Sequence, residues 1–151
     1  MIRVGFLGWG SGWADVSVAN GDIAVKMMAS YWHDSYSDIA RAAVTIMRGA
    51  PKASFVTDAE PVICEWVFER EEGDFLKVTG SSDSADSDLS FHCSFRSTPR
   101  EFGMAVLAML EGTVKSYGER RFEKRWQHAF PEAQYQELRS LLAQSGVYLG
   151  Q

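Results

Sequence analysis

Histidines are the side chains best suited to proton transfer near neutral pH, and this 151-residue chain has three, His33, His92 and His128. A serine–histidine hydrolase would also need an orienting acid and an oxyanion hole, and the sequence contains no GxSxG nucleophile elbow. His92 alternates with Ser90 and Ser94 and is expected to point outward from a strand. We therefore predict no catalytic residue. A cleft near His92 or His33 would still suit an alternative function, a small-molecule-binding or hydrolytic domain.

Metal and cofactor motifs are equally weak. The sequence has no CxxC or HExxH spacing, and Asp83, Asp86 and Asp88 do not fit the ligand positions of an EF-hand loop. The segment GWGSGW at 8–13 lacks the lysine of a phosphate-binding loop, so we interpret it as a turn. Cys64 and Cys93 fall on predicted core faces and could be neighbours across a sheet, but we expect buried thiols. We predict no metal and no cofactor.

Carboxylates are the most unevenly distributed side chains. Between Asp58 and Asp88 there are ten acidic and two basic residues, a local net charge of −8, whereas the rest of the chain has a net charge of +3. This pattern has two interpretations. The segment is either a solvated face kept soluble by its charge, or a docking surface for a basic protein partner.

The docking interpretation assigns a set of partner-binding residues on one predicted strand and the hairpin that follows it. Their carboxylates would attract a basic partner, and their exposed apolar side chains would anchor it. The set is Glu65, Val67, Glu69, Glu71, Glu72, Asp74 and Phe75.

Basic residues gather later in the chain, in the segment ERRFEKRW at 119–126. RNA binding is one interpretation, but Glu119 and Glu123 offset part of the charge, and Phe122 and Trp126 fit a core stripe. The overall net charge of −5 also disfavours nucleic acid and anionic lipid as partners. A homodimer in which this segment contacts the acidic sheet is a further alternative.

Residues 62–96 predict the central structural unit. VICEWVFER, DFLKVTG and LSFHCSFR alternate apolar and polar residues, which is typical of three consecutive antiparallel strands with one buried face. A three-residue loop at 71–73 would pair Phe68 with Leu76 and Trp66 with Val78. The inner face of the third strand would hold Leu89, Phe91, Cys93 and Phe95, and residues 81–88 would form a loop.

The first 60 residues predict further strands and one helix. We expect a strand over 2–9, then a hairpin with Asn20-Gly21 as its turn, which pairs Val18 with Ile23 and Val16 with Val25. Residues 22–32 also suit a helix. A helix with Ser35 as its N-cap should follow and end at Gly49 and Pro51, before a short strand over 55–57.

The last third of the chain predicts helices. Thr98-Pro99-Arg100-Glu101 is a capping box with proline in the first turn, and apolar residues then recur at helical spacing. We expect a second helix from Tyr117 to Phe130 and a last one after Pro131. The fold class is therefore α+β, a single antiparallel sheet of about five to seven strands covered by helices, in one domain spanning 1–151.

Bulk composition fits a globular protein, with 46% hydrophobic and 13% aromatic residues. The longest uninterrupted apolar run, Met104–Leu110, is far shorter than the roughly 20 residues that span a bilayer. Glycines interrupt the N-terminal apolar residues, so no signal sequence is predicted. We expect a cytoplasmic protein with no membrane partner.

The order of elements resembles a known family, the small immunity proteins of bacterial polymorphic toxin systems. The resemblance spans roughly residues 30–142 and lies in turn and packing positions: Asp58, Glu60-Pro61, Trp66, Tyr117-Gly118, Trp126 and Phe130-Pro131. It implies a cytoplasmic protein without catalytic residues that binds and blocks a toxin domain, often a basic nuclease, through an acidic surface. Our leading hypothesis is thus an immunity-type inhibitor of a basic partner, ahead of a ligand-binding or hydrolytic domain and of a structural homodimer built on an exposed sheet edge or on the basic helix.

Overall fold

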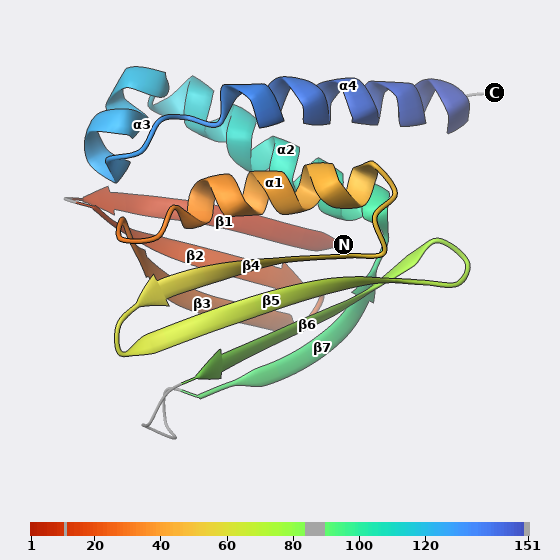
Figure 1. The fold of residues 1–151 in the computed structure, drawn as a ribbon, viewed down its shortest axis with the longest axis horizontal. Helices are drawn as coiled ribbons and strands as arrows, with labels where there is room; N and C mark the ends of the chain where they lie inside the picture. Colours follow the sequence, from red (N-terminus) through yellow and green to blue (C-terminus); the bar gives the residue numbers. More distant parts are fainter. Residues whose placement is uncertain (11, 84–89, 150–151) are drawn as a thin grey trace.

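The computed structural model describes residues 1–10, 12–83 and 90–149, which form seven strands and four helices (Figure 1). Most of the predicted loop over 81–88, together with Asp86, Asp88 and Leu89, lies outside the described residues. In chain order the elements are β1 (Ile2–Gly10), β2 (Trp13–Asn20), β3 (Ile23–Ser30), α1 (Ser35–Met47), β4 (Lys52–Ala59), β5 (Val62–Glu71), β6 (Phe75–Asp83), β7 (His92–Ser97), α2 (Pro99–Ser116), α3 (Glu119–Trp126) and α4 (Glu132–Leu149).

The strands form two antiparallel sheets, β1-β2-β3 and β4-β5-β6-β7. The α+β class is confirmed, but the prediction of a single sheet is wrong. Each sheet has one apolar face, and the two apolar faces bury each other: the Trp66 indole N–H of β5 donates to Met27 Sδ of β3 at 3.2 Å. The Asn20 side chain reaches from the β2–β3 turn to the carbonyl oxygen of Arg96 on β7, at 3.2 Å. Alternation in the sequence predicts a buried face but does not tell what covers it.

The helices lie together along one side of the molecule, with α4 outermost (Figure 1). Beneath them, the Phe102 ring of α2 stacks on Phe68 of β5 with centroids 4.0 Å apart. Tyr36 of α1 meets Phe6 of β1 edge to face at 5.0 Å and contacts Phe122 of α3 at 4.5 Å. One hydrophobic core cluster therefore joins both sheets to the helical layer.

The helices begin and end close to the positions that the sequence predicts, with shifts of a few residues. Thr98 caps α2, and its side chain accepts the Glu101 N–H at 3.1 Å. The cap of α1 is Asp34 rather than Ser35, because the Asp34 carboxylate accepts the Ser37 N–H. Helix α3 ends at Trp126, where Gln127 adopts a left-handed conformation, so Phe130 is buried from a loop instead of from a helix.

Two hairpin registers are each two residues away from the prediction. The β2–β3 loop is Gly21-Asp22, which pairs Val18 with Val25, and the β5–β6 loop is residues 72–74, which pairs Phe68 with Val78. Local contacts explain both shifts. Asn20 stays in its strand while its side chain bonds to Arg96, and Glu71 stays in its strand while its carboxylate pairs with Arg96 at 3.3 Å.

A shift of two residues keeps every side chain on its predicted face. Outward positions of β5 are Glu65, Val67 and Glu69, and the residues between them are buried. Residues 90–96 also alternate as predicted, although Phe91, Cys93 and Phe95 are only half-buried because β7 is an edge strand. The strand over 2–9 and the strand interpretation of 23–32 are both correct, and the 55–57 strand is longer than predicted.

Two glycines provide a matched test of this packing. A methyl group on Gly80 would meet the buried Trp66 ring at 2.6 Å, whereas one on Gly112, in α2, would meet nothing within 4 Å. We expect Gly80→Ala to lower the free energy of unfolding by about 1–3 kcal/mol and Gly112→Ala to raise it by about 0.5–1 kcal/mol. Urea unfolding with unchanged slopes would measure both, and a neutral Gly80→Ala would contradict the contact with Trp66.

Tyr36 makes the stability of the fold depend on pH in the alkaline range. Its buried hydroxyl donates to Thr113 Oγ1 at 2.8 Å, and burial raises the pKa of Tyr36 well above its usual range. The unfolded tyrosine ionises near pH 10, whereas the folded one does not. The contribution of the buried, protonated Tyr36 to the free energy of unfolding is therefore complete below about pH 10 and is lost above it.

We expect Tyr36→Phe to lower the free energy of unfolding by about 0.5–1.5 kcal/mol at neutral pH. Its stability should also fall less steeply above pH ~10 than that of the wild type. Parallel unfolding profiles across that range would contradict this role.

Candidate functional site

The structure places the seven predicted partner-binding residues along one surface. Glu65, Val67, Glu69 and Glu71 point outward from β5, and Phe75 of β6 lies opposite Glu71. Glu72 and Asp74 lie in the connecting hairpin loop. The described helices lie together along one side of the molecule (Figure 1), and α2 contacts β5 through Phe68, whose side chain is on the opposite face of the strand from Val67 and Glu69. The residues are thus brought together as the sequence predicts.

Basic side chains balance most of the charge on this surface. Glu69 is flanked across the strands by Lys52 of β4 and Lys77 of β6. Arg96 of β7 pairs with Glu71 at 3.3 Å, and its guanidinium lies over the Phe75 ring at 5.5 Å. In the loop, Asp74 pairs with Arg70 at 3.0 Å. The hairpin end of the face is therefore mixed in charge, and the segment count of −8 overstates its acidity.

A pocket at the opposite end of β5 lacks such compensation. Its volume is about 420 Å³, and its lining residues come from the ends of β2 and β3, the turn before α1 and the β4–β5 turn. Two indoles and two carboxylates line it, and none of its described lining residues is basic. The lining residues are Trp13, Ser30, Trp32, Asp58 and Glu60.

Local contacts hold the pocket at the seam between the two sheets. The Ser30 hydroxyl donates to the Asp58 carbonyl oxygen at 2.9 Å, which joins the end of β3 to the end of β4. The Asp58 carboxylate accepts the Glu60 N–H at 3.2 Å and so fixes the turn. The Trp32 ring stacks on Tyr31 with centroids 5.4 Å apart. The position of Tyr31 is itself fixed, since its N–H donates to the Gly12 carbonyl oxygen at 2.8 Å.

Exposure distinguishes these two tryptophans from two others, Trp66 and Trp126. Trp32 is 80% exposed and Trp13 is 43% exposed, whereas Trp66 and Trp126 are fully buried. An exposed indole next to carboxylates suits a Lys or Arg side chain, because the aromatic face and the carboxylate both attract a cation. Tryptophan is also among the residues most enriched at binding hot spots.

The pocket is continuous with the predicted face. Asp58 of β4 lies directly opposite Ile63 of β5, and Val56 lies opposite Glu65. Ile63 is 39% exposed and adds apolar area between the pocket and β5. We define the seam surface as Trp13, Trp32, Asp58, Glu60, Ile63 and Glu65. Sequence reasoning missed its centre, because the segment 8–13, which contains Trp13, was interpreted only as a turn and Trp32 was not recognised.

The three histidines do not converge. His33 Nε2 lies 2.5 Å from the Asp38 carboxylate, and His128 Nε2 lies 2.5 Å from the Tyr31 carbonyl oxygen. His92 is exposed on β7 opposite Ser81. Within the described part of the chain, no group of three His, Cys, Asp or Glu side chains could hold a metal ion.

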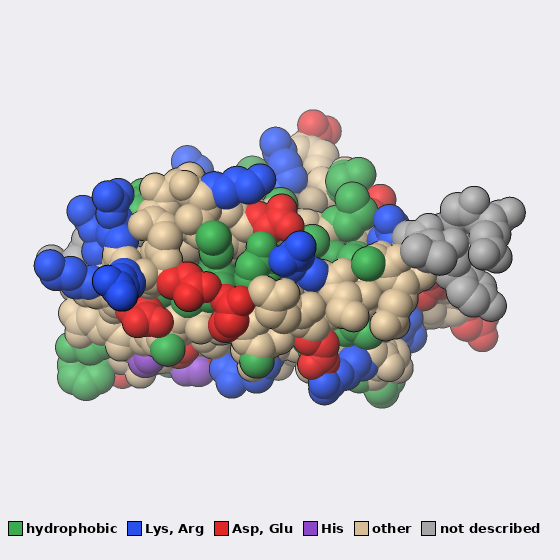
Figure 2. Space-filling view, turned by 90° about the horizontal axis from the view of Figure 1, so that it is seen from above, with side chains coloured by type: hydrophobic (Ala, Val, Ile, Leu, Met, Phe, Trp, Pro, Cys, Tyr) green, Lys and Arg blue, Asp and Glu red, His purple; other side chains and the backbone are tan. Residues whose placement is uncertain are grey.

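The basic segment forms the outer side of α3. Its Lys and Arg side chains are exposed and gather at the end of the helical side where α3 lies (Figure 2). Phe122 and Trp126 are buried, as the core-stripe interpretation predicts. The Trp126 indole N–H donates to the Asp34 carboxylate at 2.9 Å. The aromatic residues of this segment are therefore not available to stack on nucleic acid bases.

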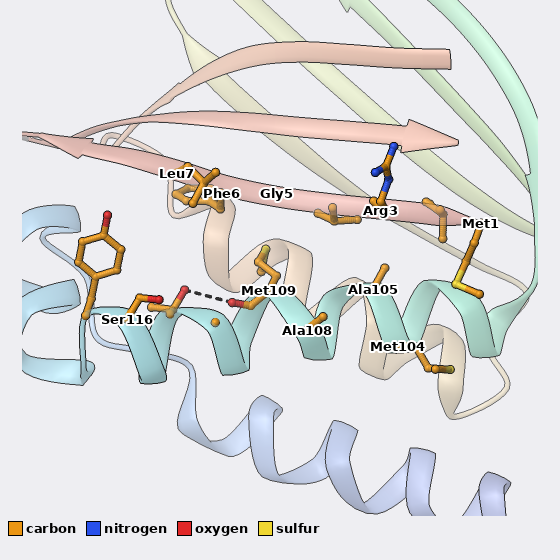
Figure 3. A pocket seen from close by; sticks show the side chains of 15 residues that line it. Met1, Arg3, Gly5, Phe6, Leu7, Met104, Ala105, Ala108, Met109 and Ser116 are labelled. Atoms are coloured by element: carbon orange, nitrogen blue, oxygen red, sulfur yellow. Dashed lines mark hydrogen bonds between the residues drawn. The ribbon is translucent and has the colours of Figure 1, made fainter. Parts of the chain in front are cut away.

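A second pocket, of about 540 Å³, runs between β1 and α2 (Figure 3). Its α2 wall consists largely of small side chains and methionines, including Met104, Ala105, Ala108 and Met109 (Figure 3). Its other wall is β1, which is an edge strand of the three-stranded sheet. The pocket is apolar and lies away from the seam surface.

The comparisons with known proteins give no match to a family model, to a curated protein or to a solved structure. Among the described helices, none combines the length and the apolar character needed to cross a bilayer.

The two cysteines are separate thiols. Cys64 of β5 lies opposite Ser82 of β6, while Cys93 of β7 lies opposite Gly80 of β6, so an entire strand separates them. Two strand spacings are about 9.5 Å, which exceeds the roughly 7 Å that a disulfide can bridge.

Burial raises the pKa of both the Cys64 and the Cys93 thiol. We expect an aromatic disulfide reagent at neutral pH to react slowly with half-buried Cys93 and still more slowly with buried Cys64. When the protein is unfolded in urea without a reductant, the same reagent should react with two thiols per chain. Rapid reaction of Cys64 in the native protein would contradict its burial.

Proposed function

We propose that this protein is a non-enzymatic binding protein, of the immunity type, that neutralises a basic toxin domain. The observation that carries the proposal is the seam surface, where two exposed tryptophans lie beside two carboxylates that no basic residue of the pocket compensates. A basic partner would insert a Lys or Arg side chain between the indoles and the carboxylates. The resemblance to immunity proteins supports the same partner class.

The arrangement favours binding over chemistry. Trp32 is already oriented by its stack on Tyr31, so little side-chain freedom is lost when a partner covers it. Asp58 and Glu60 lie in a turn fixed by the Ser30 hydroxyl and by the Glu60 N–H. A rigid aromatic anchor with carboxylates beside it is the arrangement in which a few residues supply most of the binding energy.

The predicted β5 residues take a secondary role in this proposal. Glu65 and Val67 extend the seam surface, while Glu69 and Glu71 lie among Lys52, Lys77 and Arg96. A partner that reaches the hairpin end must match a mixed pattern of positive and negative charge. Such a pattern contributes more to the specificity of binding than to its affinity. The loop residues Glu72 and Asp74, together with Phe75, would contact only a large partner.

The test is a binding titration against the purified product of the adjacent upstream reading frame, at low and high salt. We expect a complex that salt weakens but does not abolish. Trp32→Ala should raise the dissociation constant by about thirtyfold, equivalent to about 2 kcal/mol, without changing the stability of the free protein. Trp32→Phe should recover part of that loss.

The carboxylates are tested by the double variant Asp58→Asn with Glu60→Gln, which keeps the shape of the turn. We expect slower association and a weaker dependence on salt, because steering by charge acts mainly on the association rate. Asp22→Asn is the matched control, since Asp22 is an exposed carboxylate in the β2–β3 turn, at the far end of β3 from Ser30. Absence of a complex between two folded proteins, or a complex unaffected by these variants, would overturn the proposal.

A further inference from the structure

Among the described strands, β1 pairs with β2 alone, and the β2–β3 pairing shows which backbone groups of β1 lie along its outer edge. The two-residue β2–β3 loop makes Asn20 and Ile23 a hydrogen-bonded pair, so alternate residues of β2 bond to β3 and those between them bond to β1. Arg3, Gly5 and Leu7 therefore bond to β2. The N–H and C=O groups of Ile2, Val4 and Phe6 point away from β2, toward the outer edge of the sheet.

This edge lacks the devices that usually block strand addition. Residues 2–7 contain no proline and pair with β2 without a register shift. Apolar side chains are exposed beside the edge: Met1 is 72% exposed, Leu7 is 64% exposed and Met104 of α2 is 43% exposed. All three line the pocket between β1 and α2 (Figure 3). An open strand edge with such a rim is typical of a surface that another strand covers.

We propose that a second copy of this chain pairs with β1, antiparallel about a two-fold axis at Gly5. The two three-stranded sheets then form one continuous sheet of six strands. In this register Val4 exchanges backbone hydrogen bonds with Phe6 of the second copy, and Arg3 lies directly opposite its Leu7. This inference does not rest on the proposed function, because it uses the opposite edge of the β1-β2-β3 sheet from the seam with β4.

Charge complementarity selects this occupant and this register. The side chains of Arg3 and Asp15 are both exposed, and neither side chain has a hydrogen-bond or ion-pair partner among the residues that the structure describes. Asp15 lies beside Leu7 on the same outward face. Across the two-fold axis, the Arg3 stem covers Leu7 of the second copy and its guanidinium reaches Asp15 of that copy, about two strand spacings or 9.5 Å away. Symmetry makes this pair twice.

The α2 face allows the helices of the two copies to approach. Ala105, Ala108 and Gly112 recur along the pocket wall, and Gly112 has open space where a side chain would be. Small residues let two helices pack closely. A large side chain at Gly112 would fill that space without meeting any atom of its own chain.

The test is the molar mass by light scattering after size exclusion, from micromolar protein to the highest soluble concentration. The affinity tag belongs at the C-terminus, because Met1 lines the pocket. We expect a concentration-dependent dimer. Arg3→Glu and Asp15→Arg should each raise the dimer dissociation constant by about tenfold or more, and the double variant should restore it. Lys26→Glu is the matched control, an exposed charge on the outward face of β3 that should have no effect.

Gly112→Leu separates the interface from folding. We expect it to abolish the dimer while the monomer remains folded by circular dichroism and unfolds at no lower urea concentration. A monomer at every concentration would overturn the proposal and leave the edge to a strand of a different protein. A dimer that survives both Arg3→Glu and Gly112→Leu would overturn it as well.

Discussion

The fold depends on the burial of one indole between two sheets. Trp66 is fully buried, and its N–H, which would be costly to leave without a partner, donates to Met27 Sδ of the other sheet. Space for the ring exists only because Gly80 lies directly across from Trp66 on β6. Rings of Phe55, Phe91 and Phe95 surround it at 5.9–6.4 Å. The contact fixes how the β2–β3 hairpin crosses the four-stranded sheet.

That crossing also creates the external features. Where β3 meets β4, the Ser30 hydroxyl bonds to the Asp58 backbone, so the outward ends of the two sheets converge and form the seam surface. At the other edge, β1 contacts α2 on one side and turns its outer backbone groups away from β2. The proposed binding site and the proposed dimer edge are thus two consequences of one packing arrangement.

Local features could be predicted from the sequence. The alternation of apolar and polar residues in β5 and β6 predicted the buried face correctly, although the predicted register was two residues away from the observed one. A capping motif predicted the Thr98 cap and the helix that follows it. The error of a single sheet has a physical cause. An apolar face can be covered by a helix or by another sheet, and the Trp66–Met27 contact that decides between them joins residues 39 positions apart.

The candidate site was harder to predict for a similar reason. The charge count found the acidic segment, but the cations that balance it, such as Lys52 and Arg96, come from strands outside that segment. The pocket joins Trp13, Trp32 and Asp58 from three separate parts of the chain. The one available signal was that Trp13 lies near the glycine-rich turn and Trp32 lies two residues before the helix cap Asp34, where a large apolar residue is easily left exposed.

The central claim is that carboxylates of the seam surface contact basic side chains of a partner protein. Zero-length carbodiimide cross-linking of the purified complex, followed by mass spectrometry, tests it most directly, because it joins a carboxylate only to an amine in direct contact. The account predicts cross-links from Asp58, Glu60 and Glu65 to lysines of the partner. Cross-links confined to Glu132, Glu137 and the helical side, with none from the seam surface, would contradict it.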